Sequence, residues 1–110
     1  MDTIEAIKQQ IESNPIILYM KGSPNQPQCG FSARTSQAVM ACGERFAFVD
    51  VLANPEIRAK LPEYANWPTF PQLWVNGELI GGCDIVCEMH ESGELQTLIK
   101  EVAAAQSADK

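Results

Sequence analysis

The chain lacks the features that mark zinc-finger, membrane and nucleic-acid-binding proteins. It has one histidine, His90, and no two of its four cysteines are separated by only two residues, so the usual zinc-ligand spacing is absent. No apolar run approaches the roughly 20 residues that cross a bilayer. Eight Lys and Arg against fourteen Asp and Glu give a net charge of −6. An acidic chain of this kind lacks the basic surface that binds phosphate backbones and anionic membranes, so we expect no nucleic-acid and no membrane partner.

The amino-terminal segment lacks the pattern of a targeting sequence. Asp2, Glu5 and Glu12 fall where signal and transit peptides are poor in acidic residues. We therefore expect a cytoplasmic protein whose cysteines are mainly reduced thiols. The 110 residues contain no repeat and no linker-like stretch. We expect a single domain over residues 1–110, with a tail that frays from about residue 103.

Helix and strand signals alternate along the first half of the chain. Asp2 and Glu5 form a capping pair before an apolar stripe of isoleucines, which predicts a helix. A second helix is expected to carry an apolar side formed by Phe31, Thr35, Ala38, Val39 and Cys42. The predicted elements are a helix from Asp2 to Asn14, a strand over 16–20, a helix over 30–42, a strand over 46–51, and a short helix that Asn54-Pro55 opens and Pro62 interrupts.

The second half of the chain predicts a hairpin and two helices. Asn76-Gly77 stands between strand-like residues 72–75 and 78–80, a strong type I′ turn signal. Asp84 is expected to cap a helix that ends near Ser92. The last helix carries the stripe Leu95, Leu98, Ile99 and Val102. We expect the first two strands to pair in parallel through a helix, and the last two to pair antiparallel.

The tetrapeptide Cys29-Gly30-Phe31-Ser32 follows the first strand and a loop rich in Gly and Pro, where a helix begins. A thiol at that place meets free backbone N–H groups and the positive end of the helix dipole. Both favour the thiolate, which attacks disulfides and ligates metals. A dithiol redox motif would carry a second cysteine where this chain has Ser32. Cys29 is therefore the candidate catalytic thiol and metal ligand, and any second sulfur must come from elsewhere.

The other three cysteines have different contexts. Cys42 lies roughly 20 Å along the helix axis from Cys29 and on nearly the opposite side, so it is interpreted as a core thiol that cannot bridge to Cys29. Cys83 follows Gly81-Gly82, which would let the backbone approach a ligand closely, and both functional and structural roles stay open. Cys87 lies one helical turn later and is interpreted as a core residue, with its role open.

An unusual segment, Trp67-Pro68-Thr69-Phe70-Pro71, precedes the third strand. Proline is tolerated at the start of a strand, and an aromatic residue before proline favours a cis bond, which tends to mark a functional turn. The alternative is a stiff loop. Lys21 and Arg58 could each be a solvated surface charge, and Lys21, beside the Cys29 loop, is the better candidate for pairing with a carboxylate.

Together these motifs resemble the monothiol glutaredoxins of the Cys-Gly-Phe-Ser class. The resemblance runs from about Ile4 to Val102 and is closest to the short bacterial or organellar members. It rests on Tyr19-Met20-Lys21-Gly22-Ser23-Pro24, Cys29-Gly30-Phe31-Ser32, Ala65-Asn66-Trp67-Pro68-Thr69-Phe70-Pro71-Gln72 and Gly81-Gly82-Cys83-Asp84. It implies an α/β thioredoxin fold, a four-stranded mixed sheet with helices on both faces.

The resemblance also implies a glutathione site. Lys21 and Arg58 would pair with the glycine carboxylate of glutathione. The backbone of Phe70, before a cis proline, would align the cysteinyl part as an added strand. Cys83 and Asp84 would hold the γ-glutamyl end.

Members of this class hold a [2Fe–2S] cluster between two protomers, with glutathione as a ligand. Such a cluster needs four ligands, usually thiolates, and one chain presents one well-placed sulfur. Two Cys29 thiolates and two glutathione thiolates would complete the set. Because half of these ligands are exchangeable, the cluster should be easy to donate.

Three functions follow from these expectations. The first is storage of the cluster and its transfer to acceptor apoproteins, by a homodimer bridged by the cluster and two glutathiones or with a BolA-type protein that supplies a ligand. The second is an enzyme, at most a weak glutathione-dependent thiol transferase, in which Cys29 attacks a glutathionylated protein and glutathione resolves the product. The loop Pro24–Gln28 is longer than in dithiol glutaredoxins, which favours the first. The third is a redox-sensing module in which Cys29 pairs with Cys83.

Overall fold

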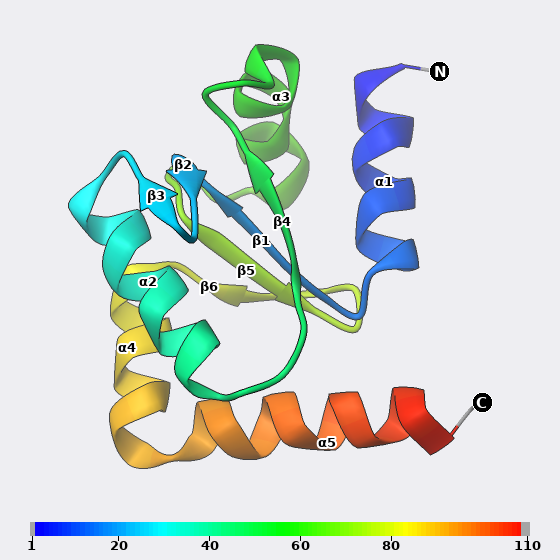
Figure 1. Ribbon diagram of the computed structural model, residues 1–110. Coiled ribbons are helices and arrows are strands. Elements are labelled where there is room, and N and C mark those ends of the chain that lie inside the picture. Colours follow the sequence, from blue (N-terminus) through cyan, green and yellow to red (C-terminus); the bar gives the residue numbers. More distant parts are fainter. Residues whose placement is uncertain (1, 109–110) are drawn as a thin grey trace.

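A four-stranded sheet lies between two layers of helices in the computed structural model, which describes residues 2–108 (Figure 1). The elements are α1 (Thr3–Ser13), β1 (Ile16–Met20), β2 (Gly22–Ser23), β3 (Gln26–Pro27), α2 (Gly30–Ala41), β4 (Ala47–Asp50), α3 (Pro55–Ala65), β5 (Gln72–Val75), β6 (Glu78–Gly81), α4 (Cys83–Ser92) and α5 (Glu94–Ala108).

The strand order in the sheet is β4-β1-β5-β6. β1 pairs in parallel with β4, with Leu18 opposite Phe48, and antiparallel with β5, with Leu18 opposite Leu73. β5 and β6 form the predicted hairpin, and positive φ angles at Asn76 and Gly77 fit the type I′ turn. The expected thioredoxin fold with its mixed sheet is therefore confirmed.

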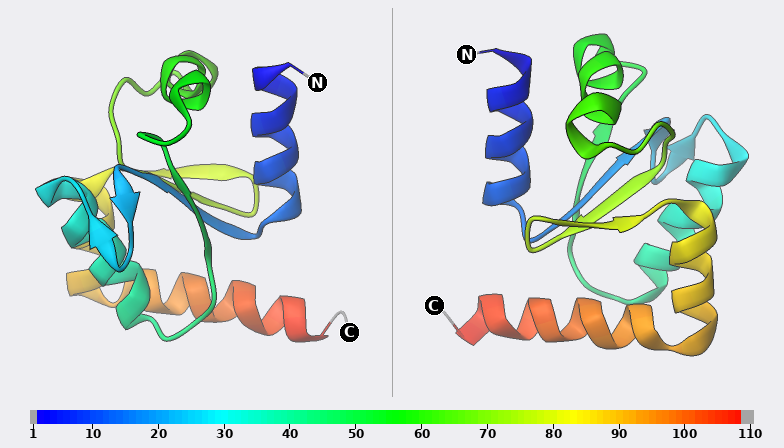
Figure 2. Two further views of the ribbon diagram at one scale, coloured as in Figure 1. Left: turned by 45° about the horizontal axis from the view of Figure 1, so that its top comes forward. Right: turned by 180° about the vertical axis from the view of Figure 1, so that it is seen from behind.

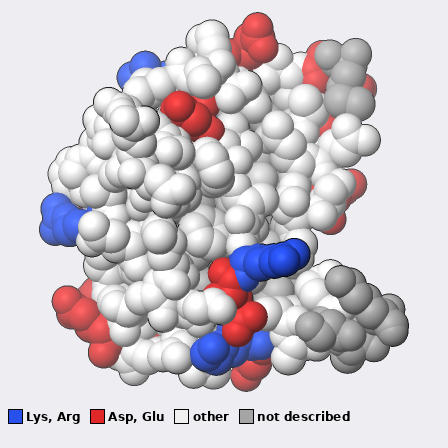
Figure 3. Space-filling model, in the orientation of Figure 1, with Lys and Arg blue, Asp and Glu red and all other residues white. Residues whose placement is uncertain are grey.

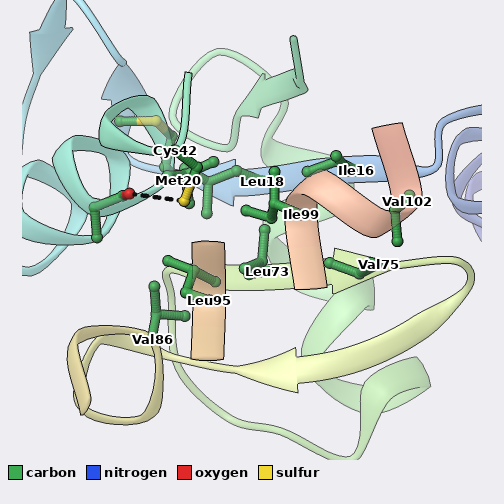
Figure 4. Close-up of a cluster of buried hydrophobic side chains, with 12 residues drawn as sticks. Ile16, Leu18, Met20, Cys42, Leu73, Val75, Val86, Leu95, Ile99 and Val102 are labelled. Carbon is green, nitrogen blue, oxygen red and sulfur yellow. Dashed lines mark hydrogen bonds between the residues drawn. The ribbon is translucent and has the colours of Figure 1, made fainter. Parts of the chain in front are cut away.

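Alternation along β1 divides the core into two parts. Ile17 and Tyr19 face one side of the sheet, where α1 and α3 pack, and Leu18 and Met20 face the other, where α2, α4 and α5 pack. Both views in Figure 2 show the two helix layers on opposite sides of the sheet. Figure 4 shows the stripe of α5 against β1 and β5, formed by Leu95, Ile99 and Val102. This central strand is buried along its whole length, so the residue that follows it emerges at a fixed edge of the sheet.

One predicted helix boundary was wrong. Pro62 does not interrupt α3, which continues to Ala65. The ring removes one backbone donor, but Ile57 and Leu61 are buried against the core just before it and hold the helix in place. The helix α5 extends to Ala108, and the fraying expected from about residue 103 stays a prediction. Residues 109–110 of the expected tail lie outside the described residues.

Two local predictions also need correction. Asp84 does not cap α4, because the helix starts at Cys83 with Gly82 as its N-cap, two residues before the predicted start. Phe31 does not face the core. Its side chain is 54% exposed, since it sits in the first turn of α2, and it lies 5.6 Å from the Arg34 guanidinium. The small hairpin of β2 and β3, in the loop before Cys29, was not predicted.

Candidate functional site

The loop that carries Cys29 is fixed at its start by Gly22. This residue has a φ of 89°, and an added Cβ would lie 2.6 Å from the carbonyl oxygen of Gln26 and 2.7 Å from the nitrogen of Gln28. Only glycine satisfies both constraints. The N–H of Gly22 donates to the Asp50 carboxylate at 2.9 Å, and the N–H of Gln28 donates back to the Lys21 carbonyl at 2.9 Å. The loop is thus tied to the ends of β1 and β4.

Cys29 is the N-cap of α2 and is partly exposed. The backbone N–H of Ser32 is the largest of the causes that lower the pKa of the Cys29 thiol. The backbone N–H of Phe31, the positive charge of Lys21 and the Ser32 hydroxyl lower this pKa further, while partial burial opposes them. Cys29 is therefore poised toward the thiolate, as the helix-start context predicts.

Ser32 has a structural task besides its effect on Cys29. Its side chain is fully buried, and its hydroxyl accepts a hydrogen bond from the N–H of Lys21 at 3.0 Å. The first turn of α2 is thereby joined to the end of β1. The sequence pattern gave no sign of this contact, because the two residues lie on different elements.

The aromatic and proline segment is held by Gln72. The side-chain amide of this buried residue donates to the carbonyl oxygens of Trp67 at 3.1 Å and Thr69 at 3.3 Å. Its oxygen accepts from the indole N–H of Trp74 at 3.1 Å. The Phe70–Pro71 bond is cis, as expected. A glutamine at the start of an otherwise apolar strand signalled these bonds, because a buried amide has to be paired.

The N-terminus of α4 lies against this segment. A Cβ on Gly82 would lie 3.2 Å from the Pro71 carbonyl oxygen and 3.5 Å from the Trp67 indole nitrogen. The absence of a side chain therefore allows Cys83 and Asp84 to approach the segment closely. Cys83 is 9% exposed, and Asp84 stands in the first turn of the helix.

These elements enclose one pocket of about 650 Å³, a size usual for small-molecule sites. Every candidate site residue from the sequence lines it. Its charged lining residues are Lys21, Arg58 and Asp84, a net charge of +1 on a chain of net charge −6. The full lining is Lys21, Cys29, Phe31, Arg58, Pro62, Trp67, Pro68, Thr69, Phe70, Pro71, Gly82, Cys83, Asp84 and Ile85.

Comparison with known proteins identifies the family of this site. The glutaredoxin family profile matches residues 16–80. The chain belongs to the glutaredoxin family. It is 68% identical to glutaredoxin 4 of Escherichia coli K12 over 98% of this chain and 94% of that protein. It is 66% identical to glutaredoxin 4 of Haemophilus influenzae strain 86-028NP over 94% of this chain and 97% of that protein.

Solved glutaredoxin structures share the fold. The solution structure of reduced poplar apo GrxS14 has a TM-score of 0.75 and 40% identity, covering 90% of this chain and 91% of that one. The crystal structure of the buckwheat glutaredoxin–glutathione complex has a TM-score of 0.76 and 26% identity, covering 90% of this chain and 88% of that one. With Ser32 three residues after Cys29, the chain is a monothiol glutaredoxin of the glutaredoxin 4 type.

The remaining thiols of this glutaredoxin lie apart from the pocket lining. Cys42 is the C-cap of α2, and its thiol donates to the Ala38 carbonyl at 3.5 Å within the core (Figure 4). Cys42 is buried in the core cluster, and burial raises the pKa of its thiol, so the interpretation as a core thiol is confirmed. Cys87 is only partly buried and contacts Cys83, so its interpretation as a core residue was wrong.

The outer surface carries its charge in scattered groups. On the face in Figure 3, charged side chains form separate groups, including a mixed acidic and basic group in its lower part, with uncharged surface between the groups. Within residues 2–108, no helix is both long and apolar enough to cross a membrane.

Proposed function

We propose that this glutaredoxin binds glutathione in the pocket and that two copies hold a [2Fe–2S] cluster between them, which they store and pass to acceptor proteins. The observation that carries the proposal is a single thiolate-prone sulfur, Cys29, at a pocket of tripeptide size. The cluster is the cargo in this function, and the thiol is the group that the chain offers to it.

The chemistry of the pocket suits glutathione. Lys21 and Arg58 match a terminal carboxylate, and a guanidinium or ammonium on a carboxylate makes a strong charge-assisted hydrogen bond. The free N–H groups at the start of α4 match a second carboxylate, and the Asp84 carboxylate matches an ammonium group. Glutathione has two carboxylates, one ammonium group and a thiol. The buckwheat glutaredoxin–glutathione complex supports the same ligand for this related chain.

In this proposal the four ligands of the cluster come from two chains. A [2Fe–2S] cluster takes four ligands, usually thiolates. Among the described residues, no three Cys, His, Asp or Glu side chains gather closely enough to hold a metal ion. Cys29 from each of two chains and the thiol of one glutathione on each chain would supply four sulfurs.

The rim of the site suits contact with a second protein. Phe31 and Ile85 line the pocket, and their side chains are 54% and 37% exposed. Apolar side chains beside a reactive thiol provide area that a partner can bury. The partner in this proposal is a second copy, a BolA-type protein or an acceptor apoprotein.

Anaerobic reconstitution with iron, sulfide and glutathione tests this function. We expect a coloured dimer that contains one cluster and two glutathiones, and we expect Cys29→Ser to remain folded and stay colourless. Cys42→Ala is the matched control, because it removes a thiol that does not line the pocket, and it should assemble the cluster. Full cluster occupancy in Cys29→Ser would reject the ligand. A colourless wild-type protein that rapidly reduces glutathionylated substrates would favour the thiol transferase instead.

A further inference from the structure

Two cysteines of α4 lie within reach of each other at the edge of the pocket. The sulfur atoms of Cys83 and Cys87 are 3.9 Å apart and share a hydrogen bond. Cys83 is the first residue of the helix and lines the pocket, whereas Cys87 lies one turn later behind it. Ser32 leaves Cys29 without a partner on its own helix, so this pair is the close dithiol among the described residues.

We propose that Cys83 and Cys87 form a second redox-active dithiol, in which Cys87 resolves a mixed disulfide between Cys83 and glutathione. The proposal deepens the proposed function, since it uses the same glutathione pocket. It assigns to Cys87 a task that is separate from the ligand role of Cys29.

The chemistry consists of two thiol–disulfide exchanges with glutathione disulfide as the oxidant. In the first, the Cys83 thiolate attacks one sulfur of glutathione disulfide, forms a Cys83–glutathione bond and releases one glutathione thiolate. In the second, the Cys87 thiolate attacks the Cys83 sulfur, forms the Cys83–Cys87 bond and releases the second glutathione thiolate. The two protons from the cysteines end on the two glutathiones. Two protein thiols are oxidised by two electrons, and one glutathione disulfide is reduced.

The position of the pair decides which sulfur is attacked. Cys87 is next to the Cys83 sulfur at 3.9 Å, and glutathione held on Cys83 would extend from there into the pocket. The incoming thiolate therefore meets the Cys83 sulfur first, and glutathione is the leaving group. An intramolecular thiol at this distance competes well against glutathione from solution, because its effective concentration is high.

Closing the bridge requires a change in the first turn of α4. Helical residues four apart have Cα atoms about 6.2 Å apart, which a disulfide allows, but their Cβ atoms are about 5–6 Å apart, which is longer than a disulfide favours. The turn must therefore tighten or unwind. Cys83 is at the end of the helix, and Gly81 and Gly82 precede it, so the chain can adjust there more easily than in the middle of a helix.

This adjustment would alter the glutathione pocket. The first turn of α4 is closed by the N–H of Val86, which donates to the Gly82 carbonyl at 3.0 Å. Asp84 lies inside that turn and lines the pocket. Oxidation of the pair would displace Asp84 and the free N–H groups beside it, so the oxidised protein should bind glutathione more weakly than the reduced protein.

The surroundings of Cys87 agree with a resolving role. Burial is the first cause that raises the pKa of the Cys87 thiol, and the hydrogen bond and charge of Cys83 raise it further, while Arg34 of α2 lowers it. Two of these causes depend on a free Cys83 thiol. They vanish once Cys83 carries glutathione, so Cys87 becomes a readier nucleophile at the stage when it is needed.

The test uses the full-length apo protein with Cys29→Ser, which removes any bridge from Cys29 to Cys83. After incubation with glutathione disulfide, peptide mass mapping should show a Cys83–Cys87 disulfide and little glutathione adduct. In the double variant Cys29→Ser/Cys87→Ser, the Cys83–glutathione adduct should accumulate, with a lifetime at least ~10-fold longer. Cys87→Ala in the same background should behave like Cys87→Ser, and circular dichroism should show that both variants are folded.

The outcomes separate this inference from the proposed function. Equal adduct lifetimes with and without Cys87, or a Cys83 thiol that both glutathione disulfide and hydroxyethyl disulfide leave unmodified, would overturn the dithiol. The same experiment with hydroxyethyl disulfide needs no glutathione pocket. Closure of the pair by that reagent, together with absent glutathione binding, would reject the glutathione site and retain the dithiol chemistry. Failure of closure with normal cluster assembly in the wild-type protein would reject the dithiol alone.

Discussion

Replacing Gln72 should lower the free energy of unfolding more than replacing an exposed glutamine. Its fully buried amide makes two hydrogen bonds to the carbonyls of Trp67 and Thr69 and accepts one from Trp74. Gln72→Met keeps a side chain of similar length, but methionine has no donor and its sulfur is only a weak acceptor. The pocket wall would then lose its attachment to β5.

The expected loss of stability follows from these three contacts. A buried hydrogen bond contributes about 1 kcal/mol net, and an unpaired buried donor such as the Trp74 indole N–H costs about 1–3 kcal/mol. Because the two bonds from the amide are shared by one nitrogen, we expect a total of ~3 kcal/mol. For a chain of this size, that lowers the melting temperature by roughly 10–20 °C.

Chemical denaturation and calorimetric titration with glutathione would measure both consequences. Gln37→Met, on the exposed side of α2, is the matched control and should be close to wild type. Gln72→Met should also weaken glutathione binding, since the loop that it holds lines the pocket. In a double-mutant cycle, Trp74→Phe should show a coupling of about 1–2 kcal/mol with Gln72→Met. A Gln72→Met protein that melts within ~2 °C of wild type would refute the reasoning.

Two further predictions concern the charges of the pocket and the order in which two thiols ionise. Lys21→Ala and Arg58→Ala should each weaken glutathione binding by ~1–2 kcal/mol, as expected for loss of a charge-assisted contact. The control Lys60→Ala removes a charge of α3 outside the pocket lining and should leave the calorimetric titration unchanged. Unaltered affinity in both pocket variants would reject the carboxylate contact. The Ser32 N–H is the main cause that lowers the pKa of Cys29, and burial is the main cause that raises the pKa of Cys87. The rate of alkylation by iodoacetamide should therefore reach its half-maximum at a lower pH for Cys29 than for Cys87. Peptide-resolved rates across neutral and alkaline pH would check the order, and a reversed or equal order would contradict the thiolate assignment.

Local patterns were sufficient to predict most of the fold. The run Ile16–Met20 is a buried strand with the bounds that its apolar residues indicate, and Asp2 caps α1 by accepting from the Glu5 N–H at 2.8 Å. The errors arose where tertiary contacts override a local preference. Because Leu61 is buried against the core, α3 continues past Pro62, although a proline inside an isolated helix would cost about 3 kcal/mol of stability.

The residues of the site could be predicted from the sequence, but the hydrogen bonds that position them could not. Motifs indicated Lys21, Cys29 and Asp84, and all three line one pocket. The bonds that position them come from side chains distant in sequence, such as the Asp50 carboxylate on the Gly22 N–H, 28 residues away. A local pattern does not specify such partners, because any strand end with an acidic residue satisfies the same pattern.

Position 32 shows why a monothiol site places its other sulfurs elsewhere. The buried Ser32 hydroxyl accepts from the Lys21 N–H, and the Ser32 N–H stabilises the Cys29 thiolate. A cysteine there would bring a larger sulfur and a weaker acceptor into a filled space, and would disturb the loop that carries Lys21. Since a bridge at this position would also occupy Cys29, a chain that keeps Cys29 free for a ligand role would carry any dithiol on another helix. In this protein, Cys83 and Cys87 of α4 are placed to provide it, at the edge of the same pocket.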